Sequence, residues 1–248
     1  KYYGVGVSDD FIATSVPASE HSLASTGIAV RGELEMLRKW ITQDYPTGIV
    51  SVISDTFDFW KVITEYAPAL KDDILNREVN DLGLAKVVFR PDSGDPVKIV
   101  TGYKVYTGLD VAGECAGELD NAWNRGFDAV LTEKGEYFEL ETVQREGLPR
   151  TRLGRQLQEC EVKGAIQVLW DNFGGTVTEQ GYKVLNERVG LIYGDSMNYE
   201  RIEAICRRLA DKVFASTNVI FGVGSFTMQY MTRDTLGMAV KATYAEVN

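Results

Sequence analysis

The sequence predicts an α/β protein built around a parallel β-sheet. Short apolar runs rich in β-branched residues recur along the chain, and helical patterns lie between them. Such runs are typical of strands buried on both faces, because helices cover a parallel sheet on its two faces. Regular alternation of strand and helix favours parallel pairing. An open doubly wound sheet and a closed barrel both fit this alternation, and the number of strands does not decide between them.

Six runs are predicted as strands, at residues 11–16, 48–53, 86–90, 189–193, 218–221 and 238–244. Helical patterns occupy residues 30–41, 57–66 and 162–173. The clearest helix follows Asn198, a candidate N-cap with Glu200 in the first turn. Its apolar residues recur on one face, at Ile202, Ile205, Cys206 and Leu209.

Residues 101–162 interrupt the alternation. This stretch is rich in glycine and glutamate and contains one helical fragment, near residues 116–123. We therefore predict an insertion after the third strand, within a single α/β domain that spans residues 1–248.

Composition excludes several classes of protein. A chain of 248 residues with 44% hydrophobic and 25% charged residues can form a large core, unlike a disordered, collagen-like or coiled-coil chain. No apolar run approaches the roughly 20 residues that cross a bilayer, so we expect no membrane contact. The start, at Lys1, lacks the layout of a signal peptide, so we expect a cytoplasmic chain from inside a longer protein.

Net charge and cysteine content exclude further classes of ligand. The net charge of -10 disfavours binding to nucleic acid. Three widely spaced cysteines and one histidine provide no standard zinc arrangement. We expect a reducing compartment and no structural metal.

Polar residues gather at the ends of the predicted strands or directly after them. They lie at residues 15–21, 51–55, 90–96, 194–196 and 222–225. In a parallel barrel the carboxyl ends of all strands face one side, where such folds bind their ligands. Five separate segments would then meet in one pocket.

The residue types in these segments suit phosphate and sugar. Gly222 and Gly224 allow close backbone approach, and a helix that starts directly after them would direct free N–H groups toward an anion. Asp92 and Asp195 can accept hydrogen bonds from ribose hydroxyls or hold Mg²⁺ through water. Arg90 supplies a planar donor fork for a carboxylate, amide or phosphate.

Each of these features also has a structural interpretation. The glycine pair fits a plain turn, and Arg90 with Asp92 fits an ion pair at a barrel rim. Asp195 and Ser196 fit a cap on the following helix. From pattern alone, His21 is as readily a structural histidine as a functional one.

Five motifs resemble those of the nicotinate/nicotinamide phosphoribosyltransferase family. They lie at residues 15–22, 51–58, 90–96, 194–195 and 221–234. The runs Arg-Pro-Asp-Ser-Gly-Asp-Pro and Ser-Val-Pro-Ala-Ser-Glu-His are long enough to be specific. The match is close to the members that use nicotinamide and looser to those that use nicotinate. It runs in order from Lys1 to Tyr244, interrupted at 101–162.

The resemblance implies a fold and an activity. The fold would be the irregular TIM-like α/β barrel of the type II phosphoribosyltransferases, working as a homodimer. The reaction would join nicotinamide to phosphoribosyl pyrophosphate in NAD salvage, giving nicotinamide mononucleotide and pyrophosphate. Mg²⁺ would be held through substrate phosphates, with no direct protein ligand, and ATP would act as an activating phosphoryl donor. A nicotinate phosphoribosyltransferase and a non-catalytic nucleotide-binding fragment are the alternatives.

The resemblance also implies roles for single residues near the ring and the sugar. Ser51 and Arg90 match residues that hold the carboxamide. Asp92 matches an aspartate that faces the ribose and contributes to catalysis. Gly194 and Asp195 match ribose contacts.

Further matched residues concern the phosphates. Gly224 and Ser225 match the loop that binds the 5′-phosphate, although Ser225 and Phe226 replace family glycines. Arg233 and Lys241 match cations that bind pyrophosphate, with the arginine reaching across the dimer.

The remaining matched residues surround the histidine. His21 matches the histidine that ATP phosphorylates, and Asp55 matches the acid that orients it. Ser15 and Val16 match residues of the substrate site. The residues that select the amide over the acid in this family would lie before Lys1, so we expect that the N-terminal part of the protein is absent here.

Overall fold

The computed structural model describes residues 16–107, 116–145, 147–194 and 197–222, together with Thr235 and Gly237. A four-stranded sheet lies at its centre, in the order β1-β2-β9-β10. These strands are β1 (Gly48–Ile53), β2 (Ala85–Arg90), β9 (Val189–Tyr193) and β10 (Val219–Phe221). Every pair in this sheet is parallel, which confirms the predicted α/β class.

Barrel closure is not seen within the described residues, where the central sheet remains open. Two of the predicted strands, at residues 11–16 and 238–244, lie outside the described part of the chain except for Val16. The other four predicted strands are confirmed to within one residue.

A short segment extends the sheet beyond β1. Ala18 forms a parallel bridge with Ser51. The Ser51 amide donates to the Pro17 carbonyl oxygen at 2.8 Å, and the Ser19 amide donates to the Ser51 carbonyl oxygen at 3.1 Å. Helix α1 (His21–Arg31) begins two residues later, at the carboxyl edge of the sheet.

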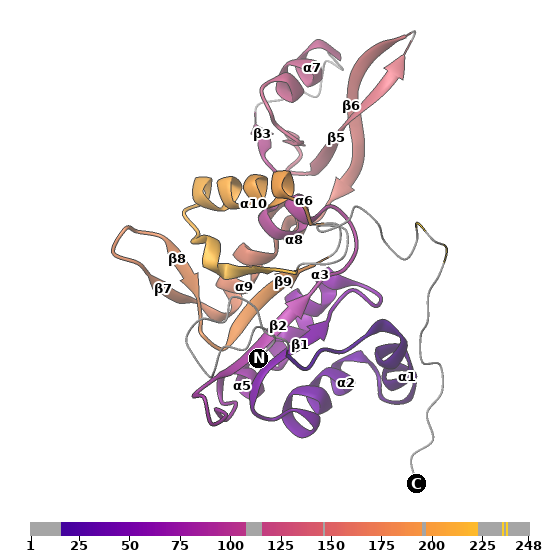
Figure 1. The fold of residues 1–248 in the computed structure, drawn as a ribbon. Helices are drawn as coiled ribbons and strands as arrows, with labels where there is room; N and C mark the ends of the chain where they lie inside the picture. Colours follow the sequence, from indigo (N-terminus) through magenta and orange to yellow (C-terminus); the bar gives the residue numbers. More distant parts are fainter. Residues whose placement is uncertain are drawn as a thin grey trace.

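Helices surround the sheet (Figure 1). In the N-terminal half they are α2 (Glu33–Lys39), η1 (Trp40–Asp44), α3 (Phe59–Lys61), η2 (Val62–Tyr66), α4 (Ala67–Ala69) and α5 (Lys71–Leu75). Later come α6 (Pro96–Thr101), α8 (Glu159–Lys163), α9 (Ala165–Phe173), α10 (Tyr199–Asp211) and η3 (Ser216–Asn218). Asn198 is confirmed as the N-cap of α10, because its side chain accepts a 2.9 Å hydrogen bond from the Arg201 amide.

Two of the predicted helices are divided where a glycine intervenes. Gly32 separates α1 from α2 with φ +80°, and Gly164 separates α8 from α9 with φ +83°. Glycine adopts positive φ without steric strain, so a continuous apolar pattern runs across two helices that differ in direction.

The main core lies on one face of the central sheet. Alternate strand residues enter it, and they are Val50, Val52, Val87, Phe89, Val189, Leu191 and Tyr193. Helices α9 and α10 contribute Ile166, Leu169, Ile205 and Leu209 to the same core. Because side chains alternate along a strand, Ser51 and Arg90 lie on the opposite face of the sheet.

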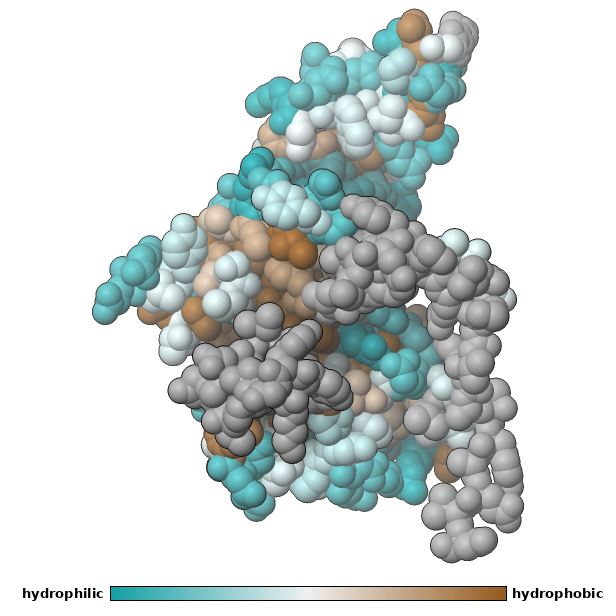
Figure 2. Space-filling model, viewed as in Figure 1, coloured by the Kyte–Doolittle hydropathy of each residue, from teal (hydrophilic) through white to brown (hydrophobic). Residues whose placement is uncertain are grey.

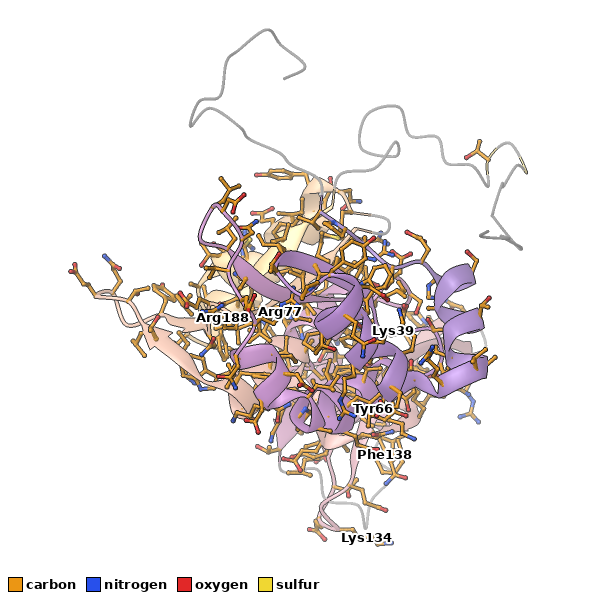
Figure 3. The ribbon with its side chains drawn as sticks, turned by 90° about the horizontal axis from the view of Figure 1, so that it is seen from below. Lys39, Tyr66, Arg77, Lys134, Phe138 and Arg188 are labelled. Carbon is orange, nitrogen blue, oxygen red and sulfur yellow. The ribbon has the colours of Figure 1, made fainter. Side chains whose placement is uncertain are left out.

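The amino edge of the sheet is held by two arginines that lie beside each other in Figure 3. Buried Arg77 donates to the carbonyl oxygens of Ile41, Thr47 and Gly48. Arg188 donates from Nη1 to the Arg77 carbonyl oxygen at 2.8 Å. These contacts stabilise the edge where the strands begin and leave the carboxyl edge for ligands.

A second sheet forms a separate lobe at the top of Figure 1. It contains β3 (Val105–Thr107), β4 (Ala129–Leu131), β5 (Tyr137–Arg145) and β6 (Leu148–Leu157), in chain order. β3 and β4 are parallel, and the other pairs are antiparallel. Helix α7 (Ala116–Asn124) packs on it, and Ala122, Val130 and Leu140 form a small core of their own. Hydrophilic and intermediate residues cover most of this lobe on the face in Figure 2.

The chain enters and leaves this lobe at one crossing point. A Cβ on Gly102 would lie 2.1 Å from the Val162 carbonyl oxygen, and one on Gly164 would lie 2.2 Å from the Gly102 amide nitrogen. Only glycine fits such an approach, and both residues have positive φ.

A hairpin of β7 (Gly175–Val177) and β8 (Lys183–Leu185) projects from the other side of the core. Among the described helices, none is both long and apolar enough to cross a membrane.

Candidate functional site

The carboxyl edge of the central sheet carries those predicted site residues that the structure describes. Ser51 lies in β1 and Arg90 is the last residue of β2, while Gly194 directly follows β9. His21 is the first residue of α1. The remaining described ones are Val16, Asp55 and Asp92. Ser15, Asp195, Gly224, Ser225, Arg233 and Lys241 lie outside the described residues.

His21 is held between two side chains that follow β1. Its Nε2 atom lies 3.5 Å from Oδ1 of Asp55, and its Nδ1 atom lies 3.2 Å from the hydroxyl oxygen of Thr56. The Asp55 side chain is 5% exposed, whereas that of His21 is 33% exposed. A carboxylate can only accept, so it favours the tautomer with the proton on Nε2. Nδ1 then carries the lone pair, which accepts from the Thr56 hydroxyl.

The second oxygen of Asp55 holds the loop that carries Asp92. Oδ2 accepts from the Asp92 amide at 2.8 Å and from the Ser93 hydroxyl at 2.6 Å. Oδ1 is buried and has no hydrogen bond within the described structure, which leaves it to the His21 ring. One buried carboxylate therefore connects the histidine to the aspartate loop.

That loop, residues 91–95, joins β2 to α6. Asp95 ends it as the N-cap of α6, accepting from the Val97 amide at 2.9 Å, and Pro96 occupies the first helical position. Gly94 has φ +85°, a value that favours glycine. The sequence thus specifies a tight loop between strand and helix, with Asp92 near its start.

Arg90 is anchored on one side and available on the other. Its Nη2 atom donates to the Ser19 carbonyl oxygen at 2.6 Å and to Oε1 of Glu20 at 3.1 Å. Its Nε atom is buried and makes no hydrogen bond within the described structure. The hydroxyl oxygen of Ser51, on the same face of the neighbouring strand, is also buried without a partner there.

Unsatisfied buried polar atoms cost free energy unless a ligand or water completes them. Two such atoms on one face of the sheet, at Ser51 and Arg90, therefore point to a ligand group that accepts hydrogen bonds. A carbonyl oxygen, as in a carboxamide, has this chemistry.

The ends of β9 and β10 approach closely through glycine. A Cβ on Gly222 would lie 2.6 Å from Cα of Gly194, and the Gly222 amide donates to the Tyr193 carbonyl oxygen at 2.8 Å. A side chain at 222 would push the two strands apart. Bare backbone at this edge suits a ligand that needs close approach.

Two cavities lie near this edge, and neither Ser51 nor His21 lines them. One, of about 270 Å³, lies behind the loop between Gly94 and the second lobe, lined in part by Lys98, Glu139 and Arg155. Another, of about 250 Å³, lies under α1 and α2. Ser51, Arg90 and Asp55 lie instead along the edge of the sheet. We therefore identify the candidate site by the chemistry of these residues and not by a cavity.

Sequence reasoning missed several contributors. Thr56 and Glu20 lie inside matched motifs, next to Asp55 and His21, and that adjacency was the available signal. Tyr193 gave no such signal, because it lies in an apolar strand and resembles a core residue.

The sequence matches the nicotinate phosphoribosyltransferase (NAPRTase) family over residues 5–248. A nicotinamide phosphoribosyltransferase of Acinetobacter baylyi is 47% identical over 237 residues, which are 96% of this chain and 37% of that protein. A nicotinamide phosphoribosyltransferase of Mycoplasma pneumoniae is 32% identical over 231 residues, which are 93% of this chain and 39% of that protein. The chain thus spans less than half the length of these relatives.

Proposed function

The chain belongs to the nicotinate phosphoribosyltransferase family, and from that premise we propose that it forms part of a nicotinamide phosphoribosyltransferase of NAD salvage. The reaction would convert nicotinamide and phosphoribosyl pyrophosphate to nicotinamide mononucleotide and pyrophosphate. The observation that carries the proposal is the pair of unsatisfied buried atoms at Ser51 and Arg90, beside the Asp55–Asp92 connection.

Ser51 and Arg90 would bind the carboxamide. Its carbonyl oxygen can accept from both the Ser51 hydroxyl and Nε of Arg90, the two atoms that lack partners in the described structure. Because both side chains rise from neighbouring parallel strands, the position of the amide is fixed by the sheet. The ring nitrogen then points away from the strands, toward the sugar.

Asp92 would act where charge develops. The ring nitrogen forms a bond to the anomeric carbon with its lone pair, and the carbon–oxygen bond to pyrophosphate breaks with its electrons leaving on the pyrophosphate. Positive charge grows on the ribose during this exchange, and a fixed carboxylate stabilises it. Gly194, at the carboxyl edge of the sheet, would contact the ribose through its backbone. Asp195 would contact the ribose as well.

His21 would accept a phosphoryl group from ATP. The Nδ1 lone pair forms a bond to the γ-phosphorus while the bond from that phosphorus to the bridging oxygen breaks, which releases ADP. Nε2 keeps its proton beside Asp55, and the carboxylate stabilises the positive ring. Nε2 and Oδ1 are separated by 3.5 Å, and a positive charge on the ring would strengthen their attraction.

Mg²⁺ fits this site as a partner of the substrate. The described residues contain no group of three or more His, Cys, Asp and Glu side chains that could hold a metal ion. In this proposal the phosphates of the substrate would supply most ligands, and Asp92 would contact the ion through water. When bound, the ion would offset negative charge on the leaving pyrophosphate.

The ion pair between Glu20 and Arg90 favours an amide over an acid. Arg90 already faces a carboxylate at 3.1 Å, so a nicotinate carboxylate would meet like charge from Glu20. A neutral carboxamide avoids that repulsion, and its NH₂ group can donate to Glu20. This is why we place nicotinamide ahead of nicotinate.

The rest of the proposal concerns parts outside the described residues. Gly224 and Ser225 would bind the 5′-phosphate, and Arg233 and Lys241 the pyrophosphate. We also propose that the full-length protein forms a closed barrel and a homodimer with shared active sites. A cytoplasmic location belongs to the proposal as well, because free thiols at Cys160 and Cys206 suit a reducing compartment.

Calorimetric titration of the full-length protein tests the proposal. Nicotinamide mononucleotide and nicotinate mononucleotide are titrated separately, and mass spectrometry follows product formation from each base and phosphoribosyl pyrophosphate. We expect preferential binding and formation of the amide nucleotide. Preference for the acid would favour the nicotinate alternative, and absence of binding and turnover with both would contradict the transferase.

A further inference from the structure

The residue that ends β9, Tyr193, contacts the aspartate loop across the sheet. Its side chain is 0% exposed and its ring packs in the main core. Its hydroxyl donates to the Ser93 carbonyl oxygen at 2.7 Å and lies 3.2 Å from the Gly94 carbonyl oxygen. The ring fixes where the hydroxyl lies, because a tyrosine buried on all sides has little freedom.

The loop is therefore fixed from two strands. On the β1 side, Asp55 accepts from the Asp92 amide and the Ser93 hydroxyl. On the β9 side, the Tyr193 hydroxyl donates to the Ser93 carbonyl oxygen and lies 3.2 Å from the Gly94 carbonyl oxygen. Asp92 lies next to Ser93, so both sets of contacts hold the backbone from which its side chain extends.

We propose that Tyr193 is a positioning residue for phosphoribosyl transfer, holding the loop of residues 91–95 so that Asp92 faces the developing charge on the ribose. This inference rests on the proposed function. In this assignment Tyr193 touches no substrate atom and acts through the loop. It also precedes Gly194 directly, so one strand end sets the loop and the neighbouring ribose contact together.

The amide-binding atoms are held by other contacts. Ser51 is fixed by its strand, and Arg90 by the Ser19 carbonyl oxygen and Glu20. Loss of the Tyr193 hydroxyl should thus disturb the sugar step while leaving nicotinamide binding intact. A general loss of folding would instead affect both.

The test compares Tyr193→Phe with the wild-type full-length protein, and uses Tyr182→Phe as the matched control. Tyr182 is exposed, in the β7–β8 hairpin. The Tyr193→Phe substitution keeps the buried ring and removes only the hydroxyl donor. We measure kcat, the KM of each substrate, the melting temperature, and deuterium exchange of the peptide that spans residues 90–97.

We expect kcat of Tyr193→Phe to fall by about tenfold to a hundredfold, the range that misplacement by up to an ångström produces. The KM of nicotinamide should remain within about twofold, and the loop amides should exchange faster, while Tyr182→Phe matches the wild type. Unchanged kcat with unchanged exchange would overturn the inference. A general loss of stability would overturn it as well. In that case every kinetic parameter worsens equally, the melting temperature falls, and deuterium exchange does not increase specifically in the loop. An inactive wild-type protein would instead refute the proposed function, and the exchange comparison would still decide whether the hydroxyl holds the loop.

Discussion

Nε2 of His21 lies 3.5 Å from Oδ1 of Asp55, while the other oxygen of that carboxylate accepts from the Asp92 amide. A change of charge on the imidazole ring therefore acts on the same side chain that positions the aspartate loop. A phosphoryl group on His21 would be coupled to the sugar site through a single buried carboxylate, with no larger rearrangement required.

We predict that Asp55→Asn abolishes most of the response to ATP. An amide next to Nε2 can donate as well as accept, so it no longer fixes the proton there, and it carries no charge to stabilise the positive ring. Acid-labile label from γ-labelled ATP, measured in the peptide that contains His21, should fall by at least about tenfold.

Asp81→Asn is the control for this experiment, since Asp81 is exposed on a turn after α5. It should retain wild-type labelling. Because the chain has one histidine, His21→Ala identifies the labelled site directly. Equal label and equal ATP stimulation in the His21→Ala protein would show that the histidine is structural.

Asp92→Asn should slow turnover by roughly two to three decades, or about 3 to 4 kcal/mol of activation free energy, the usual effect of losing one electrostatic group in a transition state. The backbone amide of residue 92 still donates to Asp55, so the fold of the loop is kept. Steady-state kinetics with the melting temperature as a control measure this. Near-normal turnover in a well-folded variant would contradict a role in the chemical step.

The sequence predicts the central strands well because each is a short run of β-branched residues with glycine or polar residues after it. Its helical pattern does not reveal the breaks at Gly32 and Gly164, since the apolar spacing continues across a change of direction that positive φ creates. The predicted strands at residues 11–16 and 238–244 lie outside the described part of the chain except for Val16, so barrel closure stays a prediction.

Site residues show the same division. His21, Asp55 and Arg90 are identifiable from motif position, because His21 and Asp55 follow predicted strands and Arg90 ends one. Their contacts are not, because they join distant parts of the chain: Arg90 reaches the Ser19 carbonyl oxygen, and Tyr193 reaches the loop at Ser93. Such contacts depend on the order of strands in the sheet, which the local pattern does not contain.

Glu20→Gln should weaken discrimination against nicotinate. The substitution keeps the length of the side chain and removes the negative charge next to Arg90, so a nicotinate carboxylate no longer meets like charge. Glu20 is 56% exposed, and solvent screening limits the effect to about 1 kcal/mol, or roughly fivefold in the ratio of kcat/KM values for acid and amide. Glu179→Gln, at an exposed turn of the β7–β8 hairpin, should leave that ratio unchanged. An unaltered ratio in Glu20→Gln would assign selectivity to other residues.

Lys212, at the end of α10, binds the two chain segments that cross at Gly102 and Gly164, at the base of the second lobe. Its Nζ atom donates to the carbonyl oxygens of Thr101 at 2.5 Å and Lys163 at 3.0 Å. Burial, and then the charge of Arg208, lower the pKa of Lys212 to about 8, although Asp128 acts to raise it. The folded protein therefore holds this proton less tightly than the unfolded chain, in which a lysine has a pKa of about 10.4.

This shift gives a pH dependence of defined sign. Below pH 8 both states carry the proton, and the unfavourable burial of charge is fully present. Between about pH 8 and pH 10.4 the unfolded chain alone keeps it, so the contribution of Lys212 to the free energy of unfolding rises with pH. Tyr103, whose pKa burial raises, acts in the opposite sense at higher pH, so the effect of Lys212 must be isolated as a difference between proteins.

Urea denaturation of the wild-type protein and of Lys212→Met, from pH 7 to pH 10, provides that difference. Methionine fills similar space without a titrating group, so the shared contributions of Tyr103 and other residues cancel. The wild type should gain about 2 kcal/mol relative to the variant across this range, after allowance for partial solvent screening. Lys134→Met, in the exposed turn between β4 and β5 and labelled at the lower end of Figure 3, should produce no such trend. A constant difference between the wild type and Lys212→Met would mean that Lys212 keeps its proton throughout, and that its two carbonyl contacts stabilise the charged form fully.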